Sequence, residues 1–377
     1  MRKPPLILVV EDHTASLDIL KARLSANNYE VITATDGVEG LDQAKKQLPD
    51  LILLDIMMPK MDGLEVCRRI KHDASLPFMP IILITAKTDS KDVVAGLEAG
   101  GDEYLAKPVD HSSLVARVKS MLRIKELHDM VLEQSNQMKL QLKTATKVQS
   151  LFWPKIPPLP EHLNIWAFSE PASYVGGDLY DIIPLPDQSI LAYVADISGK
   201  GVAAALIMAA LSTKIRTEAL LHENINNLLQ TVNTSMYRLT SDEGYFATIV
   251  LIRFFPLSGE IHFIRAGHPN PLWIVDGKSE LISTLKGISL GVVEQVSYEI
   301  QKVKLIPGSS FLLFSDGVIE AENKDQEMFG YDSLTECITG LPIPPCGESL
   351  VSAVKSWRGR AEVNDDLTIL EIWHNKV

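Results

Sequence analysis

An aspartate at the end of an apolar run is the feature of this sequence that first suggests chemistry. Residues 190–195 are apolar, which is typical of a buried strand, and Asp196 follows them. Gly199 and Gly201 permit a sharp turn before the small-residue segment 202–210, which is typical of a closely packed helix. A carboxylate at the end of a strand can bind a hard metal ion, but it can equally cap a helix. The interpretation therefore depends on further acids.

Four more aspartates in the second half of the chain lie beside strand-like runs. Asp178 follows two glycines, and Asp316 follows an apolar run and precedes a glycine. Asp365 and Asp366 come just before the last strand-like run. Because these motifs offer carboxylates and neither His nor Cys, they favour Mg²⁺ or Mn²⁺ over zinc. Two such ions sharing a bridging aspartate can activate a water and hold a phosphoryl group for in-line attack.

A second set of polar residues follows strand-like runs in the first 120 residues. The four runs and the residues that follow them are Leu6–Val10 with Glu11 and Asp12, Leu51–Leu54 with Asp55, Ile81–Ile84 with Thr85, and Glu103–Ala106 with Lys107. Helical patterns lie between or after them, at Thr14–Ala26, Gly37–Gln47, Gly63–Lys71, Ser90–Ala99 and Ser112–Leu122. This alternation predicts an α/β fold with a doubly wound parallel sheet.

The polar residues of this second set are expected to converge, because the carboxyl ends of parallel strands line one crevice. The carboxylates of Glu11, Asp12 and Asp55 would repel one another unless a divalent cation lay among them. That cation and Lys107 would neutralise a phosphoryl group arriving on an aspartate, and Thr85 could donate a hydrogen bond to it. The alternative is that these are ordinary solvated residues at strand ends. That explanation suits any one of them taken singly, but it does not account for all five occurring together.

On these residues, segment 5–124 resembles the response-regulator receiver domain. The matching motifs are Val-Glu-Asp at 10–12, Leu-Leu-Asp-Ile-Met-Met-Pro-Lys-Met-Asp-Gly at 53–63, Ile-Thr-Ala at 84–86 and Lys-Pro at 107–108. The resemblance implies that Asp55 accepts a phosphoryl group from a sensor histidine kinase or a phosphotransfer protein. It also implies that Thr85, Lys107 and Tyr104 form the switch, with Tyr104 turning inward as Thr85 moves toward the phosphoryl group.

The same resemblance implies a Mg²⁺ site in the receiver. Asp12, Asp55 and the backbone carbonyl of Met57 would bind the ion directly, and Glu11 would act through water. Many receivers carry a polar residue where Met57 stands. Because the contact implied there is made by the backbone, the substitution leaves the metal site intact.

The segment between the two halves predicts a long helix. No Pro or Gly occurs from Val109 to Trp153, and Pro154 and the proline cluster 157–160 follow. Apolar residues recur every seven residues, which indicates a coiled coil and a homodimer; they are Ile124, Val131, Met138, Ala145 and Phe152, partly supported by Leu127, Leu142 and Val148. A solvated linker helix is the alternative, because Gln134 and Gln141 occupy core-like positions.

Beyond residue 160 the pattern changes to strands in succession with a few long helices. This predicts an α+β domain in which helices flank antiparallel sheets. The expected strands are Ile165–Phe168, Ile182–Pro184, Ile190–Ala195, Ala247–Phe255, Ile261–Arg265, Leu272–Val275, Val303–Leu305, Ser310–Phe314 and Thr368–Trp373, and the expected helices are Val202–Leu221, Ile225–Leu239 and Glu348–Arg360.

This half resembles the metal-dependent serine/threonine protein phosphatases of the PPM superfamily, in the bacterial branch that controls sporulation and stress sigma factors. The resemblance covers about residues 145–374. The motifs that carry it are Val-Gly-Gly-Asp-Leu-Tyr-Asp at 175–181, Asp-Ile-Ser-Gly-Lys-Gly at 196–201, Phe-Ala-Thr at 246–248, Ala-Gly-His-Pro-Asn-Pro at 266–271, Phe-Ser-Asp-Gly-Val-Ile-Glu-Ala at 314–321 and Asp-Asp-Leu-Thr at 365–368.

The phosphatase resemblance implies two Mn²⁺ or Mg²⁺ ions. Asp196 would bridge both, and the backbone carbonyl of Ile197 would bind one of them. Asp178, Asp316 and Asp365 would complete the second site, with Asp196, Asp316 and Asp365 as the catalytic acids. Either Asp365 or Asp366 could be the direct ligand, and alignment on the following threonine favours Asp365. Eukaryotic relatives have a phosphate-binding arginine near the first acid, and no counterpart stands beside Asp178.

The two resemblances together predict an enzyme under two-component control. The expected domains are a receiver at 1–124, a helical or coiled-coil linker at 125–153 and a PPM-type phosphatase at 154–377. Phosphorylation of Asp55 would control removal of phosphate from phosphoserine or phosphothreonine on a partner protein, implied by the resemblance to be an anti-sigma-factor antagonist in a stress response. The alternative is a non-catalytic adaptor with an inactive phosphatase fold. A cyclic-dinucleotide synthase is excluded, because Leu179 replaces an acid that its motif requires.

Composition sets further limits on function. The net charge of −12 argues against sequence-independent binding to nucleic acid, which needs a basic face. Three scattered cysteines offer neither a disulfide framework nor a zinc spacing. The first residues do not resemble a secretory signal, and the longest strongly apolar run is too short to span a bilayer. We therefore expect a cytoplasmic protein with no membrane insertion.

Overall fold

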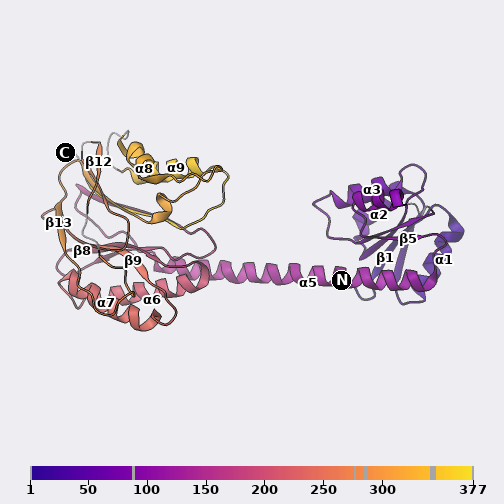
Figure 1. Cartoon of the computed structure of the whole chain (residues 1–377), viewed down its shortest axis with the longest axis horizontal. Helices are drawn as coiled ribbons and strands as arrows, with labels where there is room; N and C mark the ends of the chain where they lie inside the picture. Colours follow the sequence, from indigo (N-terminus) through magenta and orange to yellow (C-terminus); the bar gives the residue numbers. More distant parts are fainter. Residues whose placement is uncertain (1, 87–89, 276, 284–286, 340–344, 376–377) are drawn as a thin grey trace. The chain divides into compact units, whose positions relative to one another are not determined.

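A computed structural model describes residues 2–86, 90–275, 277–283, 287–339 and 345–375. The chain divides into two compact units, Met1–Lys139 and Leu140–Val377 (Figure 1). Each unit has its own sheets and its own hydrophobic core, and each is described by itself.

The first unit contains a five-stranded parallel sheet in the order β2-β1-β3-β4-β5. The strands are β1 (Leu6–Val10), β2 (Glu30–Ala34), β3 (Leu51–Asp55), β4 (Ile81–Thr85) and β5 (Glu103–Ala106). The helices are α1 (Thr14–Ser25), α2 (Gly37–Gln47), α3 (Gly63–Lys71), α4 (Ser90–Glu98) and the first part of α5 (His111–Gln149). The predicted doubly wound α/β fold is confirmed.

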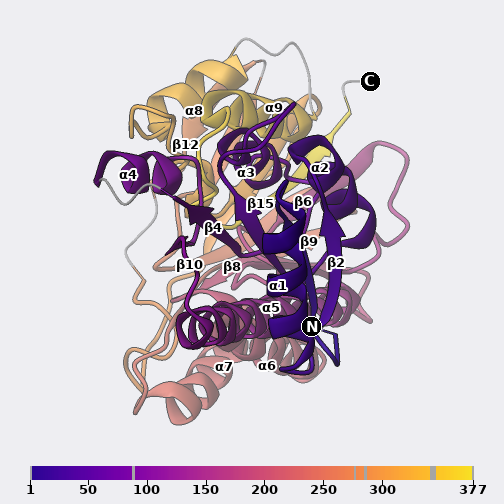
Figure 2. The same ribbon diagram turned by 90° about the vertical axis from the view of Figure 1, so that its right-hand side faces the viewer.

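Helices cover both faces of this sheet (Figure 2). Alternate residues along its inner strands pack against the helices of one face or the other. Val9 and Leu53 pack with α1 and α5, whereas Val10 and Leu54 pack with α2 and α3. Strands β1, β3 and β4 are buried at every residue, as expected for a parallel sheet covered on both sides. This two-sided burial fixes where each strand ends, and therefore where the polar residues that follow it lie.

Helix α5 is 39 residues long and is followed by the 3₁₀ turn Ser150–Phe152. The prediction of one long helix joining the two halves is confirmed. Several of its apolar side chains are exposed, namely Ile124, Leu127, Met130, Val131, Leu132, Met138, Leu140 and Val148. An exposed apolar row on a helix is the surface through which coiled coils associate.

The second unit is a sandwich of two five-stranded sheets. One has the order β13-β10-β9-β8-β7 and the other the order β12-β11-β14-β15-β6, and all strand pairs are antiparallel. The strands are β6 (Leu163–Glu170), β7 (Leu179–Pro184), β8 (Ile190–Ile197), β9 (Ala247–Phe255), β10 (Glu260–Ala266), β11 (Leu272–Val275), β12 (Lys278–Leu281), β13 (Gln301–Lys304), β14 (Ser309–Phe314) and β15 (Leu367–His374).

Helices flank this sandwich on both sides, so the predicted α+β fold is confirmed (Figure 1). Helices α6 (Gly201–Ala219) and α7 (Ile225–Thr240) pack on the sheet that contains β8 and β9. Helices α8 (Gly330–Thr339) and α9 (Gly347–Arg358) pack on the sheet that contains β14 and β15. Between the sheets, Val194 and Phe263 of one sheet pack in the same cluster as Phe311 and Leu370 of the other.

Three elements escaped prediction from the pattern of residues. Strand β2 has one fully buried residue in five, because it lies at an edge of its sheet. Strand β12 is a four-residue edge strand with no fully buried residue. Helix α8 buries only Leu334 and Ile338, and two apolar residues are too few to indicate a helical repeat in the sequence.

A buried carboxylate anchors α9 to the inner strand β15. Glu371 is fully buried, and its oxygens accept hydrogen bonds from the Ser310 hydroxyl at 2.6 Å, the Cys346 amide at 2.9 Å and the Gly347 amide at 2.8 Å. Burial raises the pKa of Glu371, although these bonds oppose the shift. The carboxylate satisfies amide groups at the start of α9, where a negative charge is also favoured by the helix dipole.

We predict that Glu371→Ala lowers the free energy of unfolding of the second unit by about 3 kcal/mol, because three buried donors lose their acceptor. Denaturant unfolding followed by tryptophan fluorescence measures this selectively, since all five tryptophans lie at or after Trp153. The matched control is Glu336→Ala, which removes an exposed carboxylate from α8 and should change stability by less than about 0.5 kcal/mol. Equal stabilities for the two variants would contradict the prediction.

Candidate metal centres

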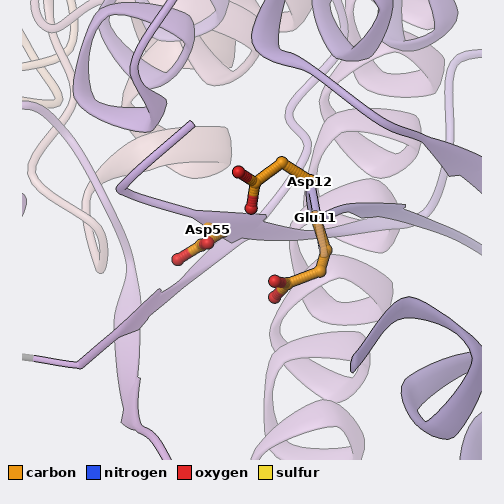
Figure 3. Close-up of side chains that lie close together, drawn as sticks. All are labelled: Glu11, Asp12 and Asp55. Atoms are coloured by element: carbon orange, nitrogen blue, oxygen red, sulfur yellow. The ribbon is translucent and has the colours of Figure 1, made fainter. Parts of the chain in front are cut away.

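Three carboxylates meet at the carboxyl edge of the sheet in the first unit (Figure 3). Asp55 ends β3, and Glu11 and Asp12 follow β1, which is the neighbour of β3. One oxygen from each residue lies within 4.8 Å of the others. Glu11 and Asp55 are buried and Asp12 is exposed, so the cluster opens to solvent on one side. The predicted convergence of these acids is therefore present in the structure.

Lys107 lies against two of these acids. Its Nζ is 2.9 Å from Oδ2 of Asp55 and 2.8 Å from Oε2 of Glu11. Burial would lower the pKa of Lys107, but its hydrogen bonds to Glu11 and Asp55 outweigh this and raise it. One ammonium group leaves part of the charge of three carboxylates uncompensated. A divalent cation bound by oxygen ligands fits this set, which is the donor chemistry that Mg²⁺ prefers.

The predicted switch residues lie on neighbouring strands. Thr85 ends β4 and is buried, and Tyr104 lies on β5, which pairs with β4. The Tyr104 side chain is 39% exposed, and the guanidinium carbon of Arg117 lies 5.7 Å from the centre of its ring. Tyr104 is therefore on the outside of the sheet edge. Met57 follows β3 and is largely exposed, as expected for a residue whose implied contact is made by the backbone.

In the second unit, strand register brings the predicted acids together in pairs. Leu179 of β7 is opposite Ala195 of β8, so Asp178, just before β7, is next to Asp196 near the end of β8. Ile369 of β15 is opposite Phe314 of β14. Asp316, just after β14, and Asp365 and Asp366, just before β15, therefore lie at the same end of the second sheet. Ile197 is the last residue of β8 and is buried.

Hydrogen bonds join the two sheets at this end of the sandwich. Oδ2 of Asp366 accepts from the Gly177 amide at 2.7 Å and from the Asp178 amide at 3.2 Å, and Oδ1 accepts from the Ala172 amide at 2.7 Å. A Cβ on Gly176 would lie 2.1 Å from Oδ2 of Asp366, so only glycine allows the approach. Asp366 thus holds the loop that presents Asp178.

The charges of this group are close enough to act on one another. Burial raises the pKa of Asp196 to about 8, and the charges of Asp316, Asp365 and Asp366 contribute to the shift. Burial and the charges of Asp196 and Asp366 also raise the pKa of Asp178 well above its usual value. Cations bound among these carboxylates would offset the repulsion and favour their ionised forms.

One observation fits divalent metal ions at this second site. Oδ2 of Asp178 is buried and has no hydrogen-bond partner among the described residues. A bound ion would supply that partner, and hard divalent ions prefer carboxylate oxygens. The residues present therefore fit divalent metal ions that bind oxygen ligands.

The structure distinguishes Asp365 from Asp366. Asp366 is buried, and its two carboxylate oxygens accept the three amide hydrogen bonds described above. Asp365 is partly exposed, and its Oδ2 lies 3.3 Å from Nζ of Lys200. Because Asp366 already has donors on both oxygens, Asp365 is the better candidate for the direct metal ligand.

One residue near this site, Lys200, was not singled out from the sequence, whereas His268 lies in the Ala-Gly-His-Pro-Asn-Pro motif at 266–271. Lys200, in the glycine turn after Asp196, donates a hydrogen bond to the Asn364 carbonyl and places a cation beside Asp365. His268 is buried, and its Nδ1 lies 2.7 Å from the Thr248 hydroxyl. Burial lowers the pKa of His268 to about 3, which favours a neutral, structural residue. The Ser-Gly-Lys-Gly turn was the available signal for Lys200.

Comparison with known families finds a match for each half of the chain. The family described as stage II sporulation protein E (SpoIIE) matches residues 186–374, about half of the chain, and the response regulator receiver domain matches residues 7–119. The response regulator PleD of Caulobacter vibrioides is 48% identical over 123 residues. That match covers 33% of this chain and 27% of PleD, so the likeness concerns the receiver alone.

Two solved structures share the fold of the second unit. The SiaA-PP2C domain of Pseudomonas aeruginosa is 23% identical, with a TM-score of 0.56, and the match covers 64% of this chain and 99% of that domain. A structure of the PP2C phosphatase domain and a regulatory-domain fragment of SpoIIE from Bacillus subtilis is 16% identical, with a TM-score of 0.51. This second match covers 57% of this chain and 64% of the other. Within the described residues, no helix combines the length and the apolar character needed to cross a bilayer.

We predict that Asp365→Ala mainly affects metal binding and that Asp366→Ala mainly affects stability. Asp365→Ala should weaken Mn²⁺ binding with little loss of stability, because it removes one charge from a repulsive group. Asp366→Ala should lower the free energy of unfolding by about 3 kcal/mol, because buried amides lose their acceptor. Calorimetric titration with Mn²⁺ and tryptophan-monitored unfolding measure the two effects. Asp366→Ala with full stability and weakened binding would reverse the assignment.

Proposed function

The chain belongs to the stage II sporulation protein E family and also carries a receiver domain, and from this we propose that it is a two-component response regulator whose output is a metal-dependent protein phosphatase. One observation carries the proposal: a single chain holds two separate carboxylate centres, one at a receiver-type sheet edge and one at the end of a phosphatase-type sandwich. We propose a receiver at 1–124, a linker at 125–153 and a phosphatase at 154–377.

In the receiver, we propose that Asp55 accepts a phosphoryl group from a sensor histidine kinase or a phosphotransfer protein. Asp12, Asp55 and the Met57 carbonyl would bind Mg²⁺, and Glu11 would act through water. The contact of Lys107 with Asp55 supports this role, because the ammonium group is already placed to neutralise charge that arrives on that carboxylate. Thr85 and Tyr104 would move when Asp55 is phosphorylated, which would alter the outer edge of the sheet.

In the phosphatase, we propose that Asp196 bridges two Mn²⁺ or Mg²⁺ ions, with the Ile197 carbonyl on one and Asp178, Asp316 and Asp365 on the other. When bound, such ions supply a water activated at neutral pH and a clamp for the phosphoryl group. Asp366 holds the loop of Asp178 in place. Lys200 adds a positive charge beside Asp365, and this charge would stabilise the negative charge of an incoming phosphate.

We propose that the substrate is phosphoserine or phosphothreonine on a partner protein of the anti-sigma-factor-antagonist type, in a stress response. This assignment rests on resemblance to the bacterial branch of the superfamily that controls sporulation and stress sigma factors. A cytoplasmic location follows from the same proposal, because sigma-factor control operates there. The exposed apolar row of α5 supports a homodimer joined through this helix.

The first test is release of phosphate from a phosphoserine protein of the antagonist type, with and without Mn²⁺. We expect activity that requires Mn²⁺ and is lost in Asp196→Asn, because the variant removes the bridging charge. We also expect the rate to change when beryllofluoride, a stable mimic of the phosphoryl group, occupies Asp55. Measuring the rate of phosphate release in the full chain gives both results.

Asp55→Asn is the control for the switch, since beryllofluoride must then have no effect on the rate. An effect that persists in Asp55→Asn would show that beryllofluoride acts on the phosphatase centre directly. A rate in the unmodified chain that ignores beryllofluoride would contradict control by the receiver. No activity in either state, together with no Mn²⁺ binding by calorimetry, would favour the non-catalytic adaptor.

A separate prediction concerns the dimer. The double variant Val131→Glu/Met138→Glu should be monomeric in sedimentation under conditions in which the unmodified chain with beryllofluoride is dimeric, because two charges enter the seven-residue seam. Leu140→Glu is the matched control, since Leu140 is equally exposed on α5 but lies outside that spacing. Loss of the dimer in Leu140→Glu alone, or its survival in the double variant, would contradict pairing through this seam.

A further inference from the structure

His268 is a buried histidine at the end of the sandwich that carries the acids. It lies in the loop between β10 and β11 and is 1% exposed. Its Nδ1 lies 2.7 Å from the hydroxyl of Thr248 on β9. The guanidinium group of Arg265 donates a hydrogen bond to the His268 carbonyl at 2.9 Å. The backbone and the ring of His268 are therefore both held in place.

Thr248 lies between this imidazole and Asp196. In the antiparallel register of β8 and β9, Thr248 is opposite Asp196. Side chains of such a pair share one face of the sheet, with Cβ atoms about 4.5–5.5 Å apart. Val194 and Val250, two residues further along the same strands, pack between the two sheets. Because side chains alternate along a strand, Asp196 and Thr248 face the same space. The Thr248 hydroxyl is thus within reach of the Asp196 carboxylate.

The imidazole ring also lies close to the second sheet. Burial lowers the pKa of His268 to about 3, and the carbonyl of Phe314 opposes this shift. The ring is therefore neutral near pH 7. Phe314 is the last residue of β14. Nε2 makes no hydrogen bond of normal geometry with any described residue, so the contact with the Phe314 carbonyl is a weak one.

A neutral ring in this position determines where the Thr248 proton goes. A neutral imidazole has one N–H donor and one acceptor nitrogen. The ring proton is assigned to Nε2, because a carbonyl accepts only from an N–H and Nδ1 is the nitrogen beside Thr248. Nδ1 then accepts the single proton of the Thr248 hydroxyl. That hydroxyl has no proton left to donate to Asp196, so the carboxylate oxygens stay available to cations.

We propose that His268 is a positioning residue that acts through Thr248: it accepts the Thr248 proton and so keeps the carboxylate of Asp196 free to bind metal ions. The inference rests on the proposed function and adds two residues to its metal centre. Neither residue needs to touch the ions or the substrate. Without the imidazole, the Thr248 hydroxyl would turn to the nearest acceptor, the Asp196 carboxylate, and compete there with the metal.

The inference predicts that a second substitution restores what the first one removes. In an Asp12→Ala background, which silences the receiver site, His268→Leu should raise the Kd for Mn²⁺ about tenfold, the lower end of the effect typical for residues that orient metal ligands. Thr248→Val alone should change the Kd less than about threefold. The double variant His268→Leu/Thr248→Val should bind Mn²⁺ as Thr248→Val does, because the competing hydroxyl is gone. Calorimetric titration measures each Kd.

Three further variants separate this role from packing. His268→Gln offers a carbonyl to Thr248 and an amide N–H to Phe314, so it should keep the Kd within about threefold. His268→Met, which has a flexible apolar side chain, provides the measurement if the leucine variant fails to fold. His262→Leu, which removes a partly buried imidazole from β10, should leave the Kd unchanged. Saturating Mn²⁺ should restore most of the rate of His268→Leu, and KM for the phosphoserine protein should change less than about twofold.

An unchanged Kd for Mn²⁺ in His268→Leu and His268→Met would overturn the positioning role. A raised Kd that Thr248→Val does not restore would overturn action through the threonine proton. The proposed function fails by a different result, the absence of Mn²⁺-dependent phosphate release by the unmodified chain, and the titrations still decide the role of His268 in that case. Absence of Mn²⁺ binding in the Asp12→Ala chain itself would overturn both.

Discussion

Repulsion between carboxylates is the constraint on which both halves of this chain depend. Each half gathers several acids at the ends of strands, where the sheet holds their backbones in place. In the receiver, Lys107 offsets part of the charge and Asp12 faces solvent, so the cluster is tolerated at moderate cost. In the second unit, burial and mutual repulsion raise the pKa values of Asp178 and Asp196, so bound cations would stabilise the ionised forms of these acids.

The rest of the second unit can be understood as the framework that resists this repulsion. Antiparallel pairing of β7 with β8 and of β14 with β15 fixes two pairs of strand ends. Asp366 then ties one sheet to the other by accepting three amides, and the chain avoids side chains at Gly176 where the contact is tight. Asp366 is thus part of the framework, whereas both oxygens of its neighbour Asp365 are free of these amide hydrogen bonds.

The sequence was informative where a residue type coincided with the end of a buried run. Glu11, Asp55, Asp196 and Asp316 could be found in this way, because burial on both faces makes a strand apolar throughout and a carboxylate marks its end. Edge strands β2 and β12 lack this contrast. The role of Asp366 could not be predicted, because the Gly177 amide that it binds lies 189 residues away in the chain, and no local pattern indicates such a contact.

The position of β15 in its sheet has a consequence for biosynthesis. This strand lies between β14 and β6, and its partner β6 is made about 200 residues earlier (Leu163 pairs with His374). While β15 is still inside the ribosome, β6 has no neighbour in its sheet, and the loop of Asp178 lacks the acceptor that Asp366 provides. Contacts between such distant segments form late in folding. The acidic centre of the second unit is therefore completed only once β15 has been synthesised and has paired with β6, and a ribosome-bound fragment that ends before β15 lacks it.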